Sequence, residues 1–237
     1  MGLDKSAVLF HNYYYMISIS GIQYQNELNS LPYFNKNQAA LLIGKKGKNL
    51  DKKLEQLKRI GYLKSLKNNY YVTEPYFQQT EKRQYSEYIA NILRFPSYIS
   101  LEYILAKENL IPEGVFSMTS ITVKSSRTYR NFLTTYAYRN IKPVLFTGYR
   151  EDLWEGKIIR RASKAKALFD FLYLKKIDNL KQEIMVDLRI NWEDFTGNDL
   201  SEFKSYVHLS RSKKMLSITS ILKKIYVSWQ FKNRLSK

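Results

Sequence analysis

The sequence predicts a mixed α/β (α+β) protein of two parts. Through residues 36–60, apolar residues recur at the spacing of two short helices, and the two Tyr-rich runs that follow are typical of a β-hairpin. From residue 115 to residue 161, short β-rich runs alternate with turn residues, and helical patterns fill the remainder. We therefore expect a first domain over residues 1–78 and a second over residues 79–237, with a short-stranded sheet and a helical C-terminal part.

The first domain is expected to begin with helices. Residues 5–17 and 21–30 have short helical patterns, the first of them rich in Tyr. Asn35 can cap a helix over residues 36–43, because its side-chain oxygen can accept a hydrogen bond from a free N–H group of the first turn. A tight basic turn bracketed by glycines, residues 44–47, separates this helix from the next.

The next helix is expected over residues 48–60 and is followed by a hairpin. Its apolar residues recur at intervals of four, three and three, which places them on one helical face: Leu50, Leu54, Leu57 and Ile60. Gly61 can end the helix in a left-handed conformation. Residues 62–66 and 70–73 are expected to be strands, because the two asparagines between them tolerate positive φ. Helix, helix and hairpin in this order predict a winged helix-turn-helix.

The second domain is expected to begin with a connecting helix over residues 76–94 and a short helix capped by Ser100. Strands are expected over four runs, which are 115–123, 128–138, 144–149 and 157–160. Ser163 can cap an amphipathic helix over residues 164–176 whose apolar side faces inward. The remainder is expected to be helical, and its basic end has no acidic residue after Glu202.

The composition favours a polyanionic partner. The sequence has 39 Lys and Arg against 21 Asp and Glu, which gives a formal net charge of +18. Nucleic acid is the first candidate and an anionic membrane surface is the second; a proteome rich in Lys, Asn, Ile and Tyr would give a similar charge without either partner. The longest apolar run near the start, residues 7–22, is too polar to span a bilayer, so we expect a soluble, cytoplasmic protein.

Most catalytic motifs are missing from the sequence. There is no Cys, which excludes disulfides, thiolate metal sites and Cys nucleophiles. The two histidines, His11 and His208, are not at metal-ligand spacing, and no glycine-rich phosphate loop or Gly-x-Ser-x-Gly motif is present. Ser163 and Lys166 have the spacing of a Ser–Lys pair, but Ser163 is more simply a helix cap. We expect no enzyme activity, cofactor or metal; a nucleic-acid hydrolase with dispersed carboxylates is the alternative.

The helix over residues 48–60 and its surroundings form the candidate DNA-binding surface. Lys side chains can neutralise phosphates, and Asn and Gln can pair with adenine edges in a major groove that is wide enough for one helix. The hairpin would contact the adjacent backbone. The candidate residues are Lys36, Lys45, Lys46, Lys48, Asn49, Lys52, Lys53, Gln56, Lys64, Lys67 and Asn68. An ordinary solvated, Lys-rich helix face is the alternative for this pattern.

A second basic series lies in the second domain and alternates with Tyr. Arg beside Tyr on a sheet can hold nucleic acid by charge and stacking. The residues of this series are Arg127, Arg130, Arg139, Lys142, Arg160, Arg161, Lys164 and Lys166. The alternative is a sheet with Tyr on its core side and Arg on its solvated side.

The second domain also carries short motifs in a characteristic order. They are Ser97-Tyr98-Ile99-Ser100-Leu101-Glu102, Leu110-Ile111-Pro112-Glu113, Ser117–Thr122, Arg127-Thr128, Tyr138-Arg139-Asn140-Ile141-Lys142-Pro143, Ser163-Lys164-Ala165-Lys166-Ala167-Leu168-Phe169-Asp170 and Leu172-Tyr173-Leu174. In this order and spacing, residues 35–176 resemble the AbiEi-type antitoxins of abortive-infection, type IV toxin–antitoxin systems. Lys164 departs from the family pattern, in which Pro is common at this position.

The resemblance implies a fold and a function. In that family an N-terminal winged helix-turn-helix precedes an α/β antitoxin domain, and the winged domain represses its own operon by binding inverted repeats in the promoter. The partner is a nucleotidyltransferase-like toxin of a phage-defence operon, which is neutralised without a stable complex. The resemblance therefore implies an antitoxin and transcriptional repressor on double-stranded DNA, as a monomer or homodimer, and the second basic series is its candidate patch for neutralisation or nucleic-acid binding. An RNA-binding or toxin-sequestering protein is the alternative.

Overall fold

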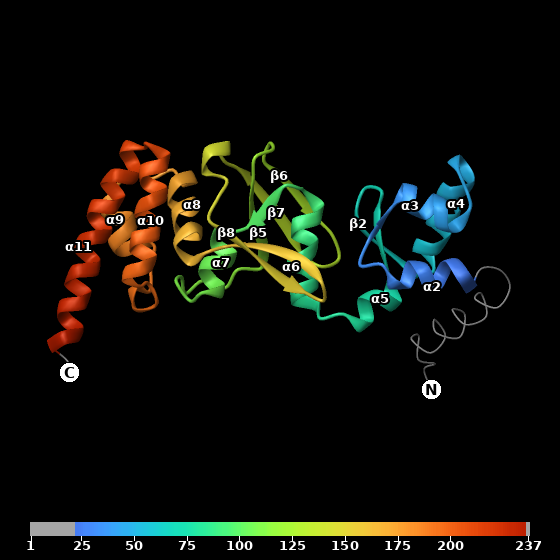
Figure 1. The fold of residues 1–237 in the computed structure, drawn as a ribbon, viewed down its shortest axis with the longest axis horizontal. Helices are drawn as coiled ribbons and strands as arrows, with labels where there is room; N and C mark the ends of the chain where they lie inside the picture. Colours follow the sequence, from blue (N-terminus) through green and yellow to red (C-terminus); the bar gives the residue numbers. More distant parts are fainter. Residues whose placement is uncertain (1–21, 236–237) are drawn as a thin grey trace, which may run out of the picture. The chain divides into compact units, whose positions relative to one another are not determined.

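The computed structural model describes residues 22–235 of the chain (Figure 1). The helix predicted over residues 5–17 lies outside the described residues. The chain divides into two compact units, Met1–Tyr85 with Arg130–Leu133, and Ser86–Tyr129 with Thr134–Lys237. Each unit contains helices and a sheet, which confirms the predicted mixed α/β class.

The first unit alternates helices with three short strands. Its elements are α2 (Ile22–Ser30), β1 (Phe34–Asn35), α3 (Lys36–Ile43), α4 (Gly47–Arg59), β2 (Leu63–Lys67), β3 (Tyr70–Thr73) and α5 (Glu74–Gln79). The strands form an antiparallel sheet in the order β1-β3-β2. The three helices and the hairpin that the sequence predicts between residues 21 and 73 are confirmed to within one residue at each end.

Local chemistry sets the ends of α3 and α4. Asn35 and Gln38 form a reciprocal capping box, in which the Asn35 side chain accepts from the Gln38 N–H at 3.0 Å and Gln38 Oε1 accepts from the Asn35 N–H at 2.9 Å. Gly44 follows α3 at φ 70°, and Gly61 comes two residues after α4 at φ 78°. This left-handed conformation is unfavourable for most other residues, so each helix ends where the sequence supplies a glycine.

Three leucines of α4 anchor the core of the first unit. Leu50, Leu54 and Leu57 are 2%, 3% and 3% exposed. They belong to one cluster with Leu28, Phe34, Ala39, Tyr62, Leu63 and Tyr71. Burying a leucine side chain is worth about 1.5–3 kcal/mol, so three of them fix this face of α4 inward. The opposite face of α4 is therefore left to solvent.

The β2–β3 hairpin is tied to the start of α3. Asn69 occupies the turn at φ 60°, a conformation that asparagine tolerates better than most residues. The Asn69 carbonyl accepts a hydrogen bond from the Lys36 N–H at 3.0 Å. The tip of the hairpin and the N-terminus of α3 are thus held together by a backbone contact as well as by the sheet.

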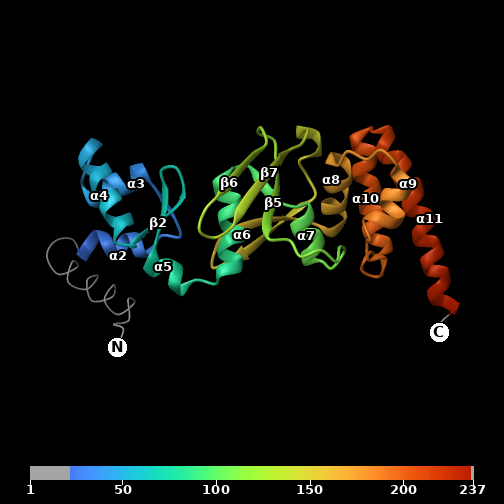
Figure 2. The same ribbon diagram turned by 180° about the vertical axis from the view of Figure 1, so that it is seen from behind.

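The second unit is built on a six-stranded mixed sheet in the order β6-β7-β5-β4-β9-β8. Figure 2 labels three neighbouring strands of this sheet, β6, β7 and β5. Its strands are β4 (Ser97–Ile99), β5 (Ser117–Thr122), β6 (Arg127–Arg130), β7 (Thr135–Asn140), β8 (Tyr149–Trp154) and β9 (Lys157–Ala162). The pairs β5–β7 and β4–β9 are parallel, and the pairs β4–β5 and β8–β9 are antiparallel. Central strand β4, only three residues long, therefore joins a parallel and an antiparallel neighbour.

Helices α6 and α8 cover opposite faces of this sheet. Successive residues of a strand point to opposite faces. In β4, the Ser97 hydroxyl donates to the Ala90 carbonyl of α6 at 3.4 Å, whereas the Tyr98 hydroxyl donates to Asp170 of α8 at 3.0 Å. The helical elements are α6 (Lys82–Leu93), α7 (Glu102–Lys107), η1 (Pro143–Leu145), α8 (Lys164–Leu174), α9 (Leu180–Gln182), η2 (Glu183–Asp187), η3 (Trp192–Asp194), α10 (Gly197–Ser210) and α11 (Lys213–Leu235). Helix α10 packs on both α8 and α11.

Two helix predictions are wrong. The single helix expected over residues 76–94 is two helices, α5 and α6, because Thr80 between them is extended at φ −94° and ψ 151°. Ser100 does not cap α7, because its hydroxyl donates to Asp170 at 2.8 Å and Leu101 precedes the helix. In contrast, Ser163 caps α8 as predicted, and its hydroxyl accepts from the Lys166 N–H at 3.0 Å.

The strand predictions for the second unit are partly wrong. The run over residues 128–138 is two strands, β6 and β7, and strand β4 was not expected. The run over residues 144–149 is not one strand: it overlaps the 3-10 turn Pro143–Leu145, in which Pro occupies the first turn, and only Tyr149 belongs to β8. The short β4 has no alternating pattern of its own, so its place in the sheet depends on its neighbours.

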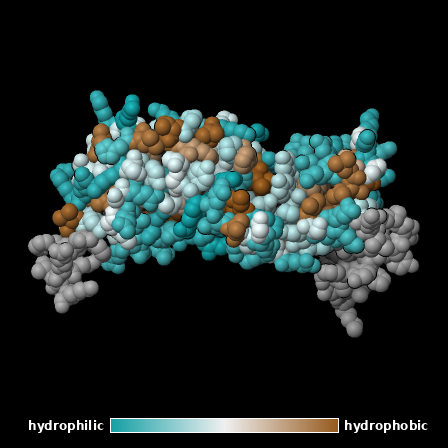
Figure 3. Space-filling view, in the orientation of Figure 1, coloured by the Kyte–Doolittle hydropathy of each residue, from teal (hydrophilic) through white to brown (hydrophobic). Residues whose placement is uncertain are grey.

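The face drawn in Figure 3 is mainly hydrophilic, with several groups of apolar side chains. Among the described residues, large exposed apolar side chains include Leu41, Phe116 and Leu153. Of the helices that the structure describes, none combines the length and the apolar character needed to cross a bilayer.

Candidate nucleic-acid interface

Helix α4 presents one polar stripe to solvent. Because a helix turns about 100° per residue, positions 48, 49, 52, 56 and 59 lie opposite or beside the face that the leucines bury. The residues there are Lys48, Asn49, Lys52, Gln56 and Arg59, all of them exposed; we call this set the α4 stripe. Its members have no ion pair or side-chain hydrogen bond with any other described residue. The stripe can therefore contact a partner without first breaking an internal contact.

The acidic residues of α4 lie on one flank of the stripe and are paired. Asp51 forms an ion pair with Lys36 of α3, and Glu55 forms one with Lys58 at 2.5 Å. The pairing with Lys58 lowers the pKa of Glu55, which keeps that carboxylate ionised and occupied. Both negative charges are therefore compensated locally, and the stripe itself is positive.

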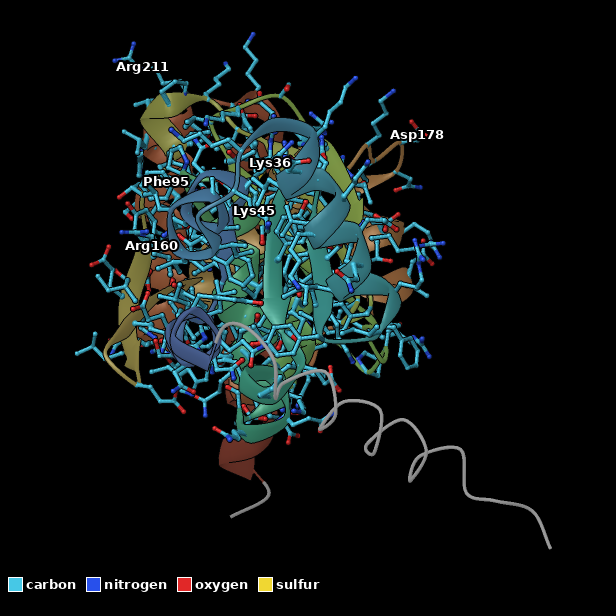
Figure 4. The ribbon with its side chains drawn as sticks, turned by 90° about the vertical axis from the view of Figure 1, so that its right-hand side faces the viewer. Lys36, Lys45, Phe95, Arg160, Asp178 and Arg211 are labelled. Atoms are coloured by element: carbon cyan, nitrogen blue, oxygen red, sulfur yellow. The ribbon has the colours of Figure 1, made fainter. Side chains whose placement is uncertain are left out.

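The turn before α4 adds further positive charge. Lys45 and Lys46 are exposed. Figure 4 labels Lys45 together with Lys36, which lies on α3. Lys46 is the N-cap of α4 but makes no side-chain capping hydrogen bond, and the first turn of α4 contains no acidic residue. Free N–H groups at a helix N-terminus favour anions, so phosphate oxygens suit this end of α4.

The predicted hairpin contacts differ in availability. Asn68 is exposed at the turn. Lys67 lies with its ammonium 4.0 Å from the centre of the Tyr70 ring, and Tyr70 is stacked on Tyr33 at 5.9 Å. Lys64 forms an ion pair with Glu74 at 2.8 Å and is the least available of the three. Lys53, a candidate on α4 outside the stripe, is half-buried, has no ion pair with a described residue and is therefore still available for a phosphate contact.

Two features near the α4 stripe and the hairpin were not predicted from the sequence. Arg59 lies seven residues after Lys52 and therefore on the same side of α4, which the helical period alone could have indicated. The stack of Tyr33 on Tyr70 joins residues distant in sequence, so only the β1–β3 pairing brings it about.

The second basic series does not gather into one exposed patch. Arg127, Arg130, Arg139 and Lys142 are exposed, and the first two lie at the ends of β6. Arg160 pairs with Glu151 at 2.8 Å and lies over the Phe95 ring. Figure 4 labels Phe95 and Arg160 on the same side of the view. The Lys164 ammonium bonds the Asp194 carbonyl. Carboxylate and carbonyl partners therefore already occupy part of this series.

Arg161 belongs to a buried ionic cluster on α6. Glu87 is fully buried and accepts hydrogen bonds from Arg161 and from Tyr103 and Lys107, the last two at 2.7 Å. Arg161 also donates to Asp152 at 2.5 Å. Burial opposes the charge of Glu87, but the three donors outweigh it and lower the pKa of that carboxyl. Arg161 thus joins β9 to α6 and is an internal contact.

Lys166 is fully buried and cannot contact a nucleic acid. Its ammonium bonds Asp170, which is also fully buried and accepts from Tyr98 at 3.0 Å and from Ser100 at 2.8 Å. Burial raises the pKa of Asp170 and lowers the pKa of Lys166, because it disfavours both charges, while their mutual attraction opposes this. Sequence alone placed Lys166 on a basic surface because it could not show that the sheet closes over it.

The arrangement does not form a Ser–Lys nucleophile. The Ser163 hydroxyl donates to Glu202 at 2.5 Å, whereas the Lys166 ammonium is directed to Asp170. A base that activates a serine must lie within hydrogen-bonding reach of its hydroxyl, and here each group has another partner. Among the described residues, no group of three or more His, Asp or Glu is placed to hold a metal ion.

Neither a protein-family model nor a curated protein matches this sequence. The α4 stripe and its basic turn are therefore a candidate functional surface by their geometry alone.

Proposed function

We propose that the first unit is a winged helix-turn-helix that binds double-stranded DNA and places α4 in the major groove. The observation that carries the proposal is the α4 stripe, which is exposed, basic and without internal partners while three leucines fix its opposite face. The element order α2-β1-α3-α4-β2-β3 places two helices before a hairpin, as expected of a winged helix-turn-helix, and the hairpin pairs with β1 in a sheet of order β1-β3-β2; both features support the proposal. The net charge of +18 suits a polyanion.

We propose further that the chain is a cytoplasmic antitoxin that represses its own operon. This step rests on the resemblance of residues 97–174 to AbiEi-type antitoxins. Its partners would be promoter DNA with inverted repeats, bound by a monomer or homodimer, and a nucleotidyltransferase-like toxin that it neutralises through the second unit. Several motif residues, Tyr98, Ser100, Lys166 and Asp170, meet in one buried hydrogen-bonded group, so the resemblance includes residues that hold the fold of that unit together.

The variant Lys52→Ala with Lys53→Ala tests the DNA proposal. Each phosphate contact releases a condensed counterion, so losing two contacts should weaken binding roughly 30-fold at about 0.15 M salt and reduce the slope of log K against log salt by about 1.8. Mobility shifts of a duplex from the chain's own promoter region, measured over a range of salt, give both quantities.

The matched control is Lys223→Ala with Lys224→Ala, which removes two adjacent exposed lysines from α11. This variant should bind the duplex as tightly as the unmodified protein and with the same salt slope. If the α11 variant loses binding and the α4 variant does not, the basic C-terminal helix is the DNA contact and α4 is not.

The antitoxin step is tested by growth rescue. We expect the full-length protein to rescue cells from a nucleotidyltransferase-like protein encoded beside it, and the Lys52→Ala, Lys53→Ala variant to rescue equally well while it no longer represses the promoter. If the variant loses rescue as well as repression, neutralisation instead depends on the first unit. A tight stoichiometric complex of the two proteins would favour sequestration.

A further inference from the structure

We infer that α4 selects duplexes with two adenines about two to three base pairs apart, one contacted by Asn49 and one by Gln56. The inference rests on the proposed DNA-binding function and adds the class of sequence that is bound. It follows from the positions of two amides on the α4 stripe and from the chemistry of base edges.

The spacing of the two amides matches the rise of B-form DNA. Asn49 and Gln56 are seven residues apart on one helix. At 1.5 Å and about 100° per residue, they lie about 10.5 Å apart along the axis and only about 20° apart around it. Base pairs are stacked about 3.4 Å apart along the DNA axis and the groove runs obliquely to that axis, so a helix lying along the groove presents the two amides about two to three steps apart.

Both amides are available for base contacts. Asn49 and Gln56 are exposed, and neither side chain has a hydrogen-bond partner in the part of the chain that the structure describes. Three other amides of the same unit are engaged: Asn35 and Gln38 in the cap of α3, and Asn29 with the Tyr62 hydroxyl at 2.8 Å. The sequence of α4 thus leaves free the two amides that share one stripe.

An amide can donate to adenine N7 and accept from the adenine N6 amino group at once. Arg or Lys most commonly contacts guanine. Between Asn49 and Gln56, α4 carries Lys52 and Lys53 but no Arg, so a guanine contact there would fall at a position other than the two that the amides contact. Carboxylates would favour cytosine, but Asp51 and Glu55 are occupied by Lys36 and Lys58. The chemistry of the stripe therefore favours adenine at both positions.

The first measurement is selection of duplexes from a random library by the full-length protein. We expect an enriched motif with adenines about two to three base pairs apart. Replacing either adenine by 7-deazaadenine, which lacks the N7 acceptor and so loses one of the two hydrogen bonds of a bidentate contact, should weaken binding by a factor between about 5 and the upper limit of about 150 for a whole bidentate contact. Asn49→Ala should abolish the effect of the analogue at one position, and Gln56→Ala should abolish it at the other.

Asn26→Ala is the matched control, because Asn26 is an exposed amide on α2 rather than on α4. It should leave both the motif and the affinity unchanged. The amide variants should keep the salt slope of the unmodified protein, because they remove no charge. A motif with guanine or cytosine at both positions, or an unchanged motif in the Asn49→Ala, Gln56→Ala double variant, would overturn the inference and leave DNA binding intact. Absence of duplex binding at low salt would instead overturn the proposed function itself.

Discussion

Replacing Asp170 by Ala is expected to lower the free energy of unfolding by about 3–5 kcal/mol, because it leaves a buried ammonium without its counter-charge. Asp170 and Lys166 are both fully buried, and the carboxylate also accepts the Tyr98 and Ser100 hydroxyl hydrogen bonds. Without it, the Lys166 ammonium would have mainly aromatic neighbours, such as the Phe169 ring at 5.0 Å. Urea denaturation followed by circular dichroism measures the loss.

Two further variants distinguish the loss of this buried ion pair from a general sensitivity of the second unit to substitution. Asp178→Ala removes an exposed carboxylate beyond the end of α8 and should change the free energy of unfolding by less than about 0.5 kcal/mol. The double variant Lys166→Met with Asp170→Leu removes both buried charges and should recover most of the loss, because apolar replacement of a buried pair is often close to neutral. A loss below about 1 kcal/mol in Asp170→Ala would mean that water reaches the pair and would contradict its burial.

The sequence could predict what depends on neighbours along the chain. Helices α3 and α4 were predicted because Asn35, the apolar period of the leucines and the flanking glycines all act within a few residues. The cap at Ser163 was predicted for the same reason. In contrast, Ser100 was expected to cap a helix, but its hydroxyl bonds Asp170, a residue seventy positions away. Contacts of that length are set by the packing of α8 on β4, which no local pattern contains.

The candidate site divides along the same line. The exposed positions of α4 follow from a helical period, so its lysines and amides could be named in advance, and Arg59 could have been added. The second basic series lies on strands and on α8, where exposure depends on what covers each face. Arg161 and Lys166 were expected at a surface but are held by Glu87 and Asp170. For Lys166 and Asp170, the sequence did contain a signal: a Lys and an Asp four residues apart on a mainly apolar helix can pair with each other.

Replacing Glu87 by Ala should destabilise the protein by about 3–5 kcal/mol at neutral pH, because Arg161 and Lys107 would lose a shared, fully buried carboxylate. The residue joins three elements: Glu87 lies on α6, Lys107 on α7 and Arg161 on β9. A matched exposed pair is Glu151 with Arg160, in which the Glu151 side chain is 47% exposed. Glu151→Gln should cost less than about 1 kcal/mol, as surface ion pairs do.

The contribution of Glu87 should also depend on pH in a defined direction. Burial raises the pKa of its carboxyl, but the hydrogen bonds from Lys107, Tyr103 and Arg161 outweigh this, so the pKa is lower in the folded protein than its usual value of about 4.3. A group with a lowered folded pKa contributes stability that is fully present above the unfolded pKa and is lost as pH falls through the folded one. The difference in free energy of unfolding between the unmodified protein and Glu87→Gln should therefore be constant from about pH 7 to pH 5 and shrink below about pH 4. Urea titrations at these pH values measure it, and a difference that stays constant down to about pH 3 would show that Glu87 contributes through its shape rather than its charge.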